Sequence, residues 1–111
     1  MIELTLKKFL DTKVEIPVVL EHQPNLPNNF VLIQKTGSSR ENLLNSSTVA
    51  IQSYGASLFE AAKLNEKIKN LMYEMVEVPE VAKVKLNSDY NFTDTETKRY
   101  RYQAVFNINH Y

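Results

Sequence analysis

The spacing of apolar residues changes partway along the chain, and this change constrains the fold more than any other feature. In residues 57–76 apolar side chains recur every three or four positions, and after Val84 they recur every second position. A period near 3.6 is typical of a helix with one buried face, and a period of two is typical of a half-buried strand. The sequence therefore predicts a helix followed by strands.

The helix predicted over residues 57–76 has clear start and stop signals. Ser57 and Glu60 have the S-x-x-E spacing of a capping box, in which each side chain satisfies a backbone N–H of the first turn. The sequence "VPE" then ends the helix, because the residue before a proline avoids helical geometry. We predict that one face packs into the core, and its residues are Leu58, Ala61, Leu64, Ile68, Leu71, Met72 and Met75.

The last part of the chain predicts a long antiparallel hairpin. Two alternating segments, residues 84–92 and 100–108, are joined by the short polar link "TDTETK". Strict alternation places Tyr90 and Phe92 on the same face as Val84 and Leu86. With the helix, this predicts a set of buried residues: Leu58, Ala61, Ile68, Leu71, Tyr90, Phe92, Tyr102 and Phe106.

The first half of the chain predicts a short helix and three strands. Apolar residues in 2–10 follow a helical stripe, and residues 14–22, 30–37 and 48–54 favour strands. Pro17 inside the first of these indicates an edge strand or a bulge. Residues 24–29, "PNLPNN", favour a turn. We expect residues 37–47 to form a polar loop that carries Leu43 and Leu44.

These elements predict one domain over residues 1–111, since 111 residues with 43% hydrophobic side chains suit a single core. The expected class is α+β with two layers, in which a mostly antiparallel sheet packs against helices. The expected order is α-β-β-β-α-β-β, ending in the long hairpin.

Cations and aromatic rings alternate near the end of the chain. Lys98, Arg99 and Arg101 are interleaved with Tyr100 and Tyr102, a mixture typical of single-stranded nucleic-acid binding. In a strand, however, alternating residues point to opposite faces, so these rings and cations separate. The 13 basic and 13 acidic residues also leave no net charge to attract a polyanion.

We therefore predict that the rings of this segment belong to the core and that Arg99 and Arg101 serve surface or subunit contacts. Replacing both arginines with Gln is then expected to leave DNA binding negligible. A small nucleic-acid-binding module that uses this hairpin stays open as the alternative function.

The sequence offers little reactive chemistry. Cysteine is absent, and neither His22 nor His110 has a second ligand at metal-binding spacing. The two glycines cannot build a phosphate loop. Serines occur without the G-x-S-x-G turn, so only unpaired Ser and His residues would support a small hydrolase function. We predict no enzyme, no catalytic residue, no cofactor and no metal site. No apolar run approaches the length of about 20 residues that spans a membrane, so we expect no membrane partner and synthesis in the cytoplasm.

Three stretches carry a resemblance to a known family: "FVLIQKTGSS", "STVAIQSYGASLFEAAKLNEKIKNLM" and "DYNFTDTETKRYRYQAVFNINHY". Together they resemble the tail-terminator, or head-to-tail joining, proteins of long-tailed bacteriophages and of prophages in Gram-positive bacteria. Members of this family are also described as minor capsid or minor tail proteins. The resemblance extends from about Lys13 to Tyr111.

The resemblance implies a structural role in virion assembly. Such proteins form a six-membered ring that caps the tail tube and joins it to the head connector, at the head–tail junction of the virion. The implied partners are other copies of the chain, the tail tube protein and the head connector protein, with DNA only as cargo in the lumen. Residues expected at subunit or partner interfaces are Leu43, Leu44, Arg99 and Arg101.

Overall fold

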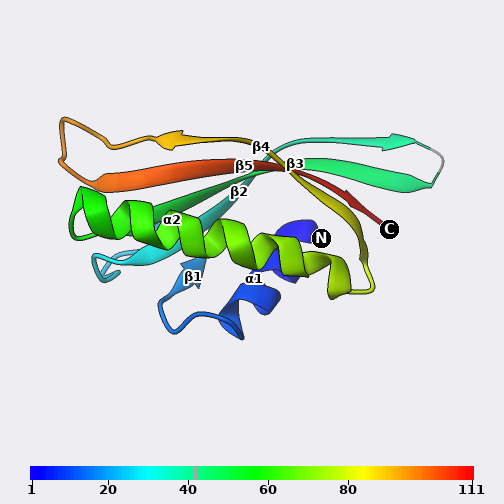
Figure 1. Ribbon diagram of the computed structural model, residues 1–111, viewed down its shortest axis with the longest axis horizontal. Coiled ribbons are helices and arrows are strands. Elements are labelled where there is room, and N and C mark those ends of the chain that lie inside the picture. Colours follow the sequence, from blue (N-terminus) through cyan, green and yellow to red (C-terminus); the bar gives the residue numbers. More distant parts are fainter. Residues whose placement is uncertain (42) are drawn as a thin grey trace.

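The computed structural model describes residues 1–41 and 43–111, and in these the chain forms one sheet with helices packed on one face (Figure 1). The predicted α+β class with two layers and the predicted element order are confirmed. In chain order the elements are α1 (Ile2–Asp11), β1 (Val18–Val19), β2 (Phe30–Glu41), β3 (Leu44–Gly55), α2 (Leu58–Tyr73), the 3-10 helix η1 (Glu74–Glu77), β4 (Val81–Asn91) and β5 (Tyr100–His110).

The sheet has the strand order β1-β2-β3-β5-β4 within the described residues. The short β1 pairs parallel with β2, and the other neighbours pair antiparallel. The β2–β3 and β4–β5 pairs are hairpins, and β3 pairs with β5 in the middle of the sheet. The expected C-terminal hairpin and the mostly antiparallel sheet are therefore confirmed.

The main core lies between the sheet and both helices. α1 contributes Ile2, Leu6 and Leu10, which recur at helical spacing and are buried. Strand residues that point to the same layer alternate along each strand, as a pleat requires. This core also contains Val31 and Ile33 of β2, Val49 and Ile51 of β3, and Ala104, Phe106 and Ile108 of β5.

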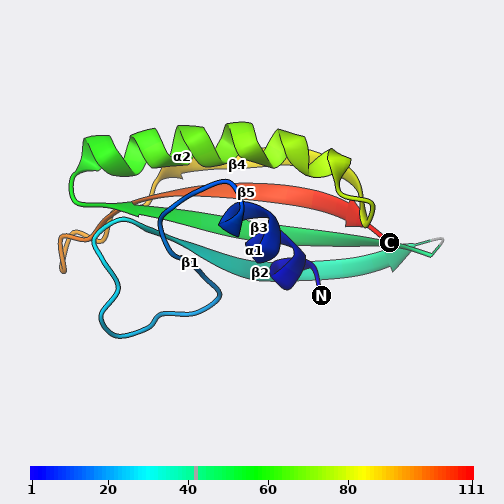
Figure 2. The same ribbon diagram turned by 90° about the horizontal axis from the view of Figure 1, so that it is seen from below.

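A smaller core lies on the opposite face of the sheet. Phe30 and Leu32 alternate with the main-core residues of β2, and they pack with Val19, Tyr54 and the half-buried Leu26. Figure 2 shows α2 on one side of the sheet and the segment between β1 and β2 on the other. The apolar run at the start of β2 is thus buried on both faces, which accounts for its nearly continuous apolar sequence.

Helix α2 confirms most of the predicted apolar face. Ser57 is the N-cap, and its Oγ accepts the Glu60 backbone N–H at 3.2 Å. Ala61, Ile68, Met72 and Met75 are buried, and Leu64 and Leu71 pack partly against the core. The prediction that Leu58 is buried is wrong, because this first helical residue remains 40% exposed. Leu58 lies next to the cap, one turn before the first buried position at Ala61.

The strand predicted over residues 14–22 is wrong in extent, because only Val18 and Val19 form β1. Pro17 has no N–H to donate to a ladder, although its carbonyl accepts the Val31 N–H at 2.9 Å. Pairing with β2 therefore begins only after the proline. Val14 is still buried in the main core, so its apolar character reflects packing rather than strand pairing.

The polar loop predicted over residues 37–47 is also wrong. Its described residues, apart from Leu43, belong to the far ends of β2 and β3, which stay paired from Gly37–Thr48 out to Glu41–Leu44. Asn42 of that predicted loop lies outside the described residues. On its other side, β3 pairs with β5 as far as Asn45–His110. Backbone pairing thus holds the segment extended although its side chains are polar.

One predicted face of the C-terminal hairpin is wrong beyond Leu86. The register of β4 against β5 shifts between Leu86 and Ser88, so one extra residue reverses the alternation. Val84 and Leu86 face the helices, but Tyr90 and Phe92 turn to the opposite face and are 41% and 39% exposed. Of the β5 residues expected in the core, Phe106 is buried and Tyr102 only half-buried.

Candidate functional site

Two surfaces of the molecule present groups that extend beyond its two cores. The first is the arm, which we define as residues 34–41 and 43–48. All side chains of residues 34–41 are exposed, and β2 is an edge strand there because β1 pairs only with Val31 and Leu32. Figure 1 shows the arm continuing past the end of α2 and η1.

Leu43 stands at the tip of the arm with an unusual combination of properties. Its side chain is 79% exposed, and its backbone has a φ of 67°, in the left-handed region. This backbone conformation is energetically unfavourable for leucine, whereas Gly and Asn adopt it at lower cost. The neighbouring Leu44 is half-buried and pairs with Glu41.

The second surface is the arginine–aromatic cluster, which consists of Phe30, Tyr54, Phe92, Arg99 and Arg101. The rings of Phe30 and Tyr54 stack with centroids 4.2 Å apart. The Arg99 guanidinium lies over both rings, 5.5 Å from the Phe30 centroid and 5.2 Å from the Tyr54 centroid. Such cation–π contacts orient a guanidinium without a carboxylate.

Arg101 is fixed from two sides. Its Nε donates to the Phe92 carbonyl at 2.6 Å, and its Nη1 donates to the Tyr54 hydroxyl at 3.0 Å. The guanidinium also lies 4.5 Å from the centroid of the Phe92 ring. The Tyr54 hydroxyl in turn donates to Gln52 Oε1 at 2.9 Å. Arg101 is therefore a rigid part of the sheet surface.

The hydrogen-bonded chain continues across the sheet. Gln52 Nε2 donates to Gln103 Oε1 at 2.9 Å, and Gln103 Nε2 donates to the Tyr90 hydroxyl. Gln52 and Gln103 face each other in the β3–β5 register, and Tyr90 faces Gln103 in the β4–β5 register. The extra residue in β4 is what brings Tyr90 and Phe92 to this face.

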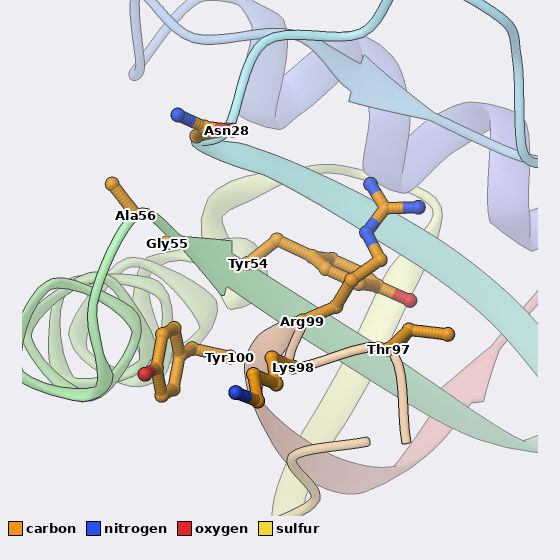
Figure 3. Close-up of a pocket in the computed structure, with 8 residues that line it drawn as sticks. All are labelled: Asn28, Tyr54, Gly55, Ala56, Thr97, Lys98, Arg99 and Tyr100. Carbon is orange, nitrogen blue, oxygen red and sulfur yellow. The ribbon is translucent and has the colours of Figure 1, made fainter. Parts of the chain in front are cut away.

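A pocket of about 260 Å³ opens beside the cluster. It lies where β3 ends and β5 begins, and Figure 3 shows Arg99 crossing over Tyr54 while Lys98 and Tyr100 are directed to the other side. Lys98 has a φ of 57°, which reverses the chain just before Arg99. The lining residues are Asn28, Tyr54, Gly55, Ala56, Thr97, Lys98, Arg99 and Tyr100.

The cations around this pocket have no ion-pair partner in the part of the chain that the structure describes. In residues 1–41 and 43–111, no carboxylate lies within 4 Å of the charged atoms of Lys98, Arg99 or Arg101. The nearby Asp94 is engaged locally, since its Oδ1 accepts the backbone N–H of Glu96 at 3.0 Å and that of Thr97 at 3.4 Å. Hydrogen bonds from the Thr97 side chain and these amides lower the pKa of Asp94, with a contribution from Arg101.

The structure separates the four residues that the sequence proposes for interfaces. Leu43 and Leu44 lie at the tip of the arm, while Arg99 and Arg101 lie at the opposite end of the molecule (Figures 1 and 2). The predicted separation of rings from cations holds for Tyr100 and Tyr102, which alternate with the arginines, but the prediction that the Tyr100 ring belongs to the core is wrong, because this side chain is exposed. The rings that meet the arginines in space are Phe92, Tyr54 and Phe30, which come from other strands.

Sequence reasoning missed these ring partners because the sequence of β4 gives no sign of the extra residue that shifts its register against β5. The run from Lys83 to Asn91 reads as regular alternation, and glycine, the usual mark of a bulge, is absent from it. The stacked pair of Phe30 and Tyr54 is set by the β2–β3 register, in which the two residues are partners.

Metal-ligand clusters and membrane-spanning helices are both absent from the residues that the structure describes. In these, no group of three or more His, Cys, Asp or Glu side chains gathers as a metal ion requires. Among the helices of the same residues, none is long and apolar enough to cross a membrane. In comparisons with known proteins, the sequence matches no protein-family model and no curated protein.

Proposed function

We propose that the protein is a structural virion subunit that assembles with copies of itself into a ring at the head–tail junction of a long-tailed phage. The tail tube protein and the head connector protein would be its partners, and DNA would pass through the lumen. The sequence resemblance suggests this role. The observation that supports it best is the arm, which carries an exposed leucine away from the core.

The backbone of Leu43 strengthens the case for an intermolecular role. An exposed leucine in a left-handed conformation contributes neither burial nor favourable backbone energy to its own chain. A tight hairpin connection needs a left-handed backbone but not a leucine side chain, and residues strained in this way often lie at binding sites. We therefore assign Leu43 to a contact with a neighbouring subunit.

A groove at the other end of the molecule fits this contact. It measures about 390 Å³ and lies along the start of α2, where Phe59 is 75% exposed. Leu64 lines it together with Phe59, so the groove offers apolar side chains to the leucine at the tip of the arm. The complete lining is Asn29, Phe59, Glu60, Lys63, Leu64 and Lys67.

The positions of the two surfaces favour head-to-tail assembly. The arm tip and the start of α2 lie at opposite ends of a molecule that measures 44 × 25 × 24 Å (Figure 1). When two different patches on one subunit bind each other, association is head-to-tail and produces a ring if the rotation closes. The occupant of the groove is therefore the arm of a second copy.

The sharpest test replaces Leu43 with Asn, which tolerates a left-handed backbone. We expect Leu43→Asn to keep or raise the melting temperature of the monomer and to abolish the ring, as measured by light scattering and native mass spectrometry. Phe59→Ser should also abolish the ring. Val76→Ser is a matched control, because Val76 is an exposed apolar residue outside both surfaces.

Mixing the two variants gives a second readout. Leu43→Asn retains an intact groove and Phe59→Ser retains an intact arm, so an equimolar mixture should give heterodimers that do not close. Rings formed by both variants would refute the arm–groove contact. A wild-type chain that stays monomeric, alone and with the tail tube protein, would refute the ring itself.

A nucleic-acid-binding module, the alternative function, uses a different surface. It depends on the arginine–aromatic cluster and does not require the ring.

A further inference from the structure

The arginine–aromatic cluster holds two guanidinium groups that form no ion pair within the described residues. Arg99 rests on the Phe30–Tyr54 stack, and no hydrogen bond to its guanidinium occurs within the described residues. Arg101 uses Nε and Nη1 internally. Its remaining donors and all those of Arg99 are free for solvent or for an anion, and the rings have already restricted the positions of both groups.

The two arginines differ from ordinary surface cations because their side chains are already held in place before an anion binds. Long basic side chains normally lose rotamer freedom when they bind an anion, and this loss weakens binding. Here the stacked rings, the Phe92 carbonyl and the Tyr54 hydroxyl hold the arginines before any ligand arrives. Lys98 adds a third cation that lines the adjoining pocket, on the other side from the Arg99 guanidinium (Figure 3). The geometry is suited to an anion with several acceptor oxygens, such as a phosphate group.

Exposed rings border the same cations. Tyr90 and Phe92 lie edge to face on the open side of the sheet, with centroids 5.8 Å apart. Neither ring is covered by α1 or α2, because the extra residue in β4 turns both away from the helices. The exposed parts of these rings can contact a flat apolar group, next to the guanidinium that already lies over Phe92.

Phosphate oxygens next to a flat ring are what a nucleotide strand presents. We propose that the arginine–aromatic cluster binds single-stranded nucleic acid, with backbone phosphates at Lys98, Arg99 and Arg101 and an unstacked base against Phe92 and Tyr90. A duplex fits less well, because its bases are stacked inside and cannot reach the rings. This binding is independent of the ring and reverses the expectation drawn from the sequence.

The affinity should be modest and salt-dependent. The chain has no net charge, so only the local cations contribute to long-range attraction. Three phosphate contacts to a single strand predict that log K falls with log salt concentration with a slope of about −2. This small slope distinguishes a defined site from a broad basic surface.

The test uses fluorescence anisotropy of the full chain with a labelled oligothymidylate of about 15 nucleotides at low salt. Lys98→Gln with Arg99→Gln should weaken binding at least about tenfold. Lys83→Gln with Lys85→Gln is the matched control, since it removes two charges from the far end of β4, where these residues pair with Asn109 and Asn107. The control should weaken binding about twofold or less.

Phe92→Leu supplies a second variant that keeps all charges and removes one ring. It should weaken binding of the oligothymidylate about five- to tenfold, in line with the loss of one base–aromatic stack. Circular dichroism checks that each variant is folded.

Three results would overturn the proposal. The first is that the wild-type chain does not bind the oligothymidylate at low salt. The second is that Lys98→Gln with Arg99→Gln weakens binding no more than the Lys83→Gln, Lys85→Gln control does. The third is that the chain binds the oligothymidylate and a duplex of the same length with equal affinity. None of them bears on ring assembly, which the light-scattering experiment measures separately.

Discussion

Gly55 at the end of β3 lies directly against the backbone of Ala61 in the first turn of α2. A Cβ atom on residue 55 would come within 2.4 Å of the Ala61 nitrogen and 2.9 Å of the Glu60 carbonyl carbon. Both atoms belong to the backbone, so no side chain can move aside. This contact sets the distance at which α2 crosses the sheet.

We expect Gly55→Ala to destabilise the fold by about 1–3 kcal/mol or more, because the helix must shift away from the sheet. Gly37→Ala is the control, because a Cβ atom on residue 37, in the arm, would meet no atom within 4 Å. Urea denaturation measures both, and equal free energies of unfolding would contradict this role of Gly55.

A second prediction compares two large aliphatic residues of α2. Ile68 is fully buried, and Ile68→Ala should cost about 2–5 kcal/mol. Leu58→Ala should cost markedly less, since Leu58 is largely outside the core. Asn70→Ala, an exposed change on the same helix, should stay within about 0.5 kcal/mol of wild type. An unfolding midpoint unchanged by Ile68→Ala would show that this helix face is misassigned.

The third prediction concerns the hydrogen-bonded chain across the sheet. Gln52→Leu leaves the Tyr54 hydroxyl without its acceptor and Gln103 Oε1 without its donor. The expected cost is about 1–3 kcal/mol, because Gln52 is buried and its partners lose their hydrogen bonds away from water. Gln34→Leu makes the same replacement at an exposed position of β2 and should be nearly neutral. Thermal melting measures both variants, and an equal melting temperature for the two would contradict a stabilising role of the Gln52 hydrogen bonds.

The fourth prediction concerns pH. Burial lowers the pKa of His110, because desolvation disfavours the imidazolium, and the charge of Lys35 acts in the same direction. His110 Nε2 also lies 2.7 Å from Ser47 Oγ. The unfolded chain thus binds a proton more readily than the folded one between the two pKa values. Stability is complete above the unfolded pKa of about 6.5 and decreases as pH falls toward the lower folded value.

Melting temperatures at pH 7.5 and pH 5.5, values chosen to lie about one unit on either side of that pKa, measure this effect. His110→Gln should show a smaller decrease between the two pH values than wild type. The same decrease in both proteins would assign the pH dependence to other groups.

The sequence by itself determined the elements that carry a strong local signal. The cap at Ser57, the helical stripe through Ala61 and Ile68 and the alternation around Phe106 each depend on neighbours within a few residues. The spacing of apolar residues indicates which face of a helix or strand is buried, and that face is the same in any fold that buries the element. These local signals were enough to predict the fold class, the order of the elements and the C-terminal hairpin.

Only the tertiary structure decided where polar strands continue and which strand residues meet. The arm is extended because β3 pairs with both β2 and β5, although its side chains predict a loop. Phe92 meets Arg101 because one additional residue in β4 reverses the pleat. A backbone hydrogen bond does not depend on the side chain it carries, and a one-residue shift moves every later side chain to the other face. Register is therefore set by the whole sheet, and the composition of one strand does not reveal it.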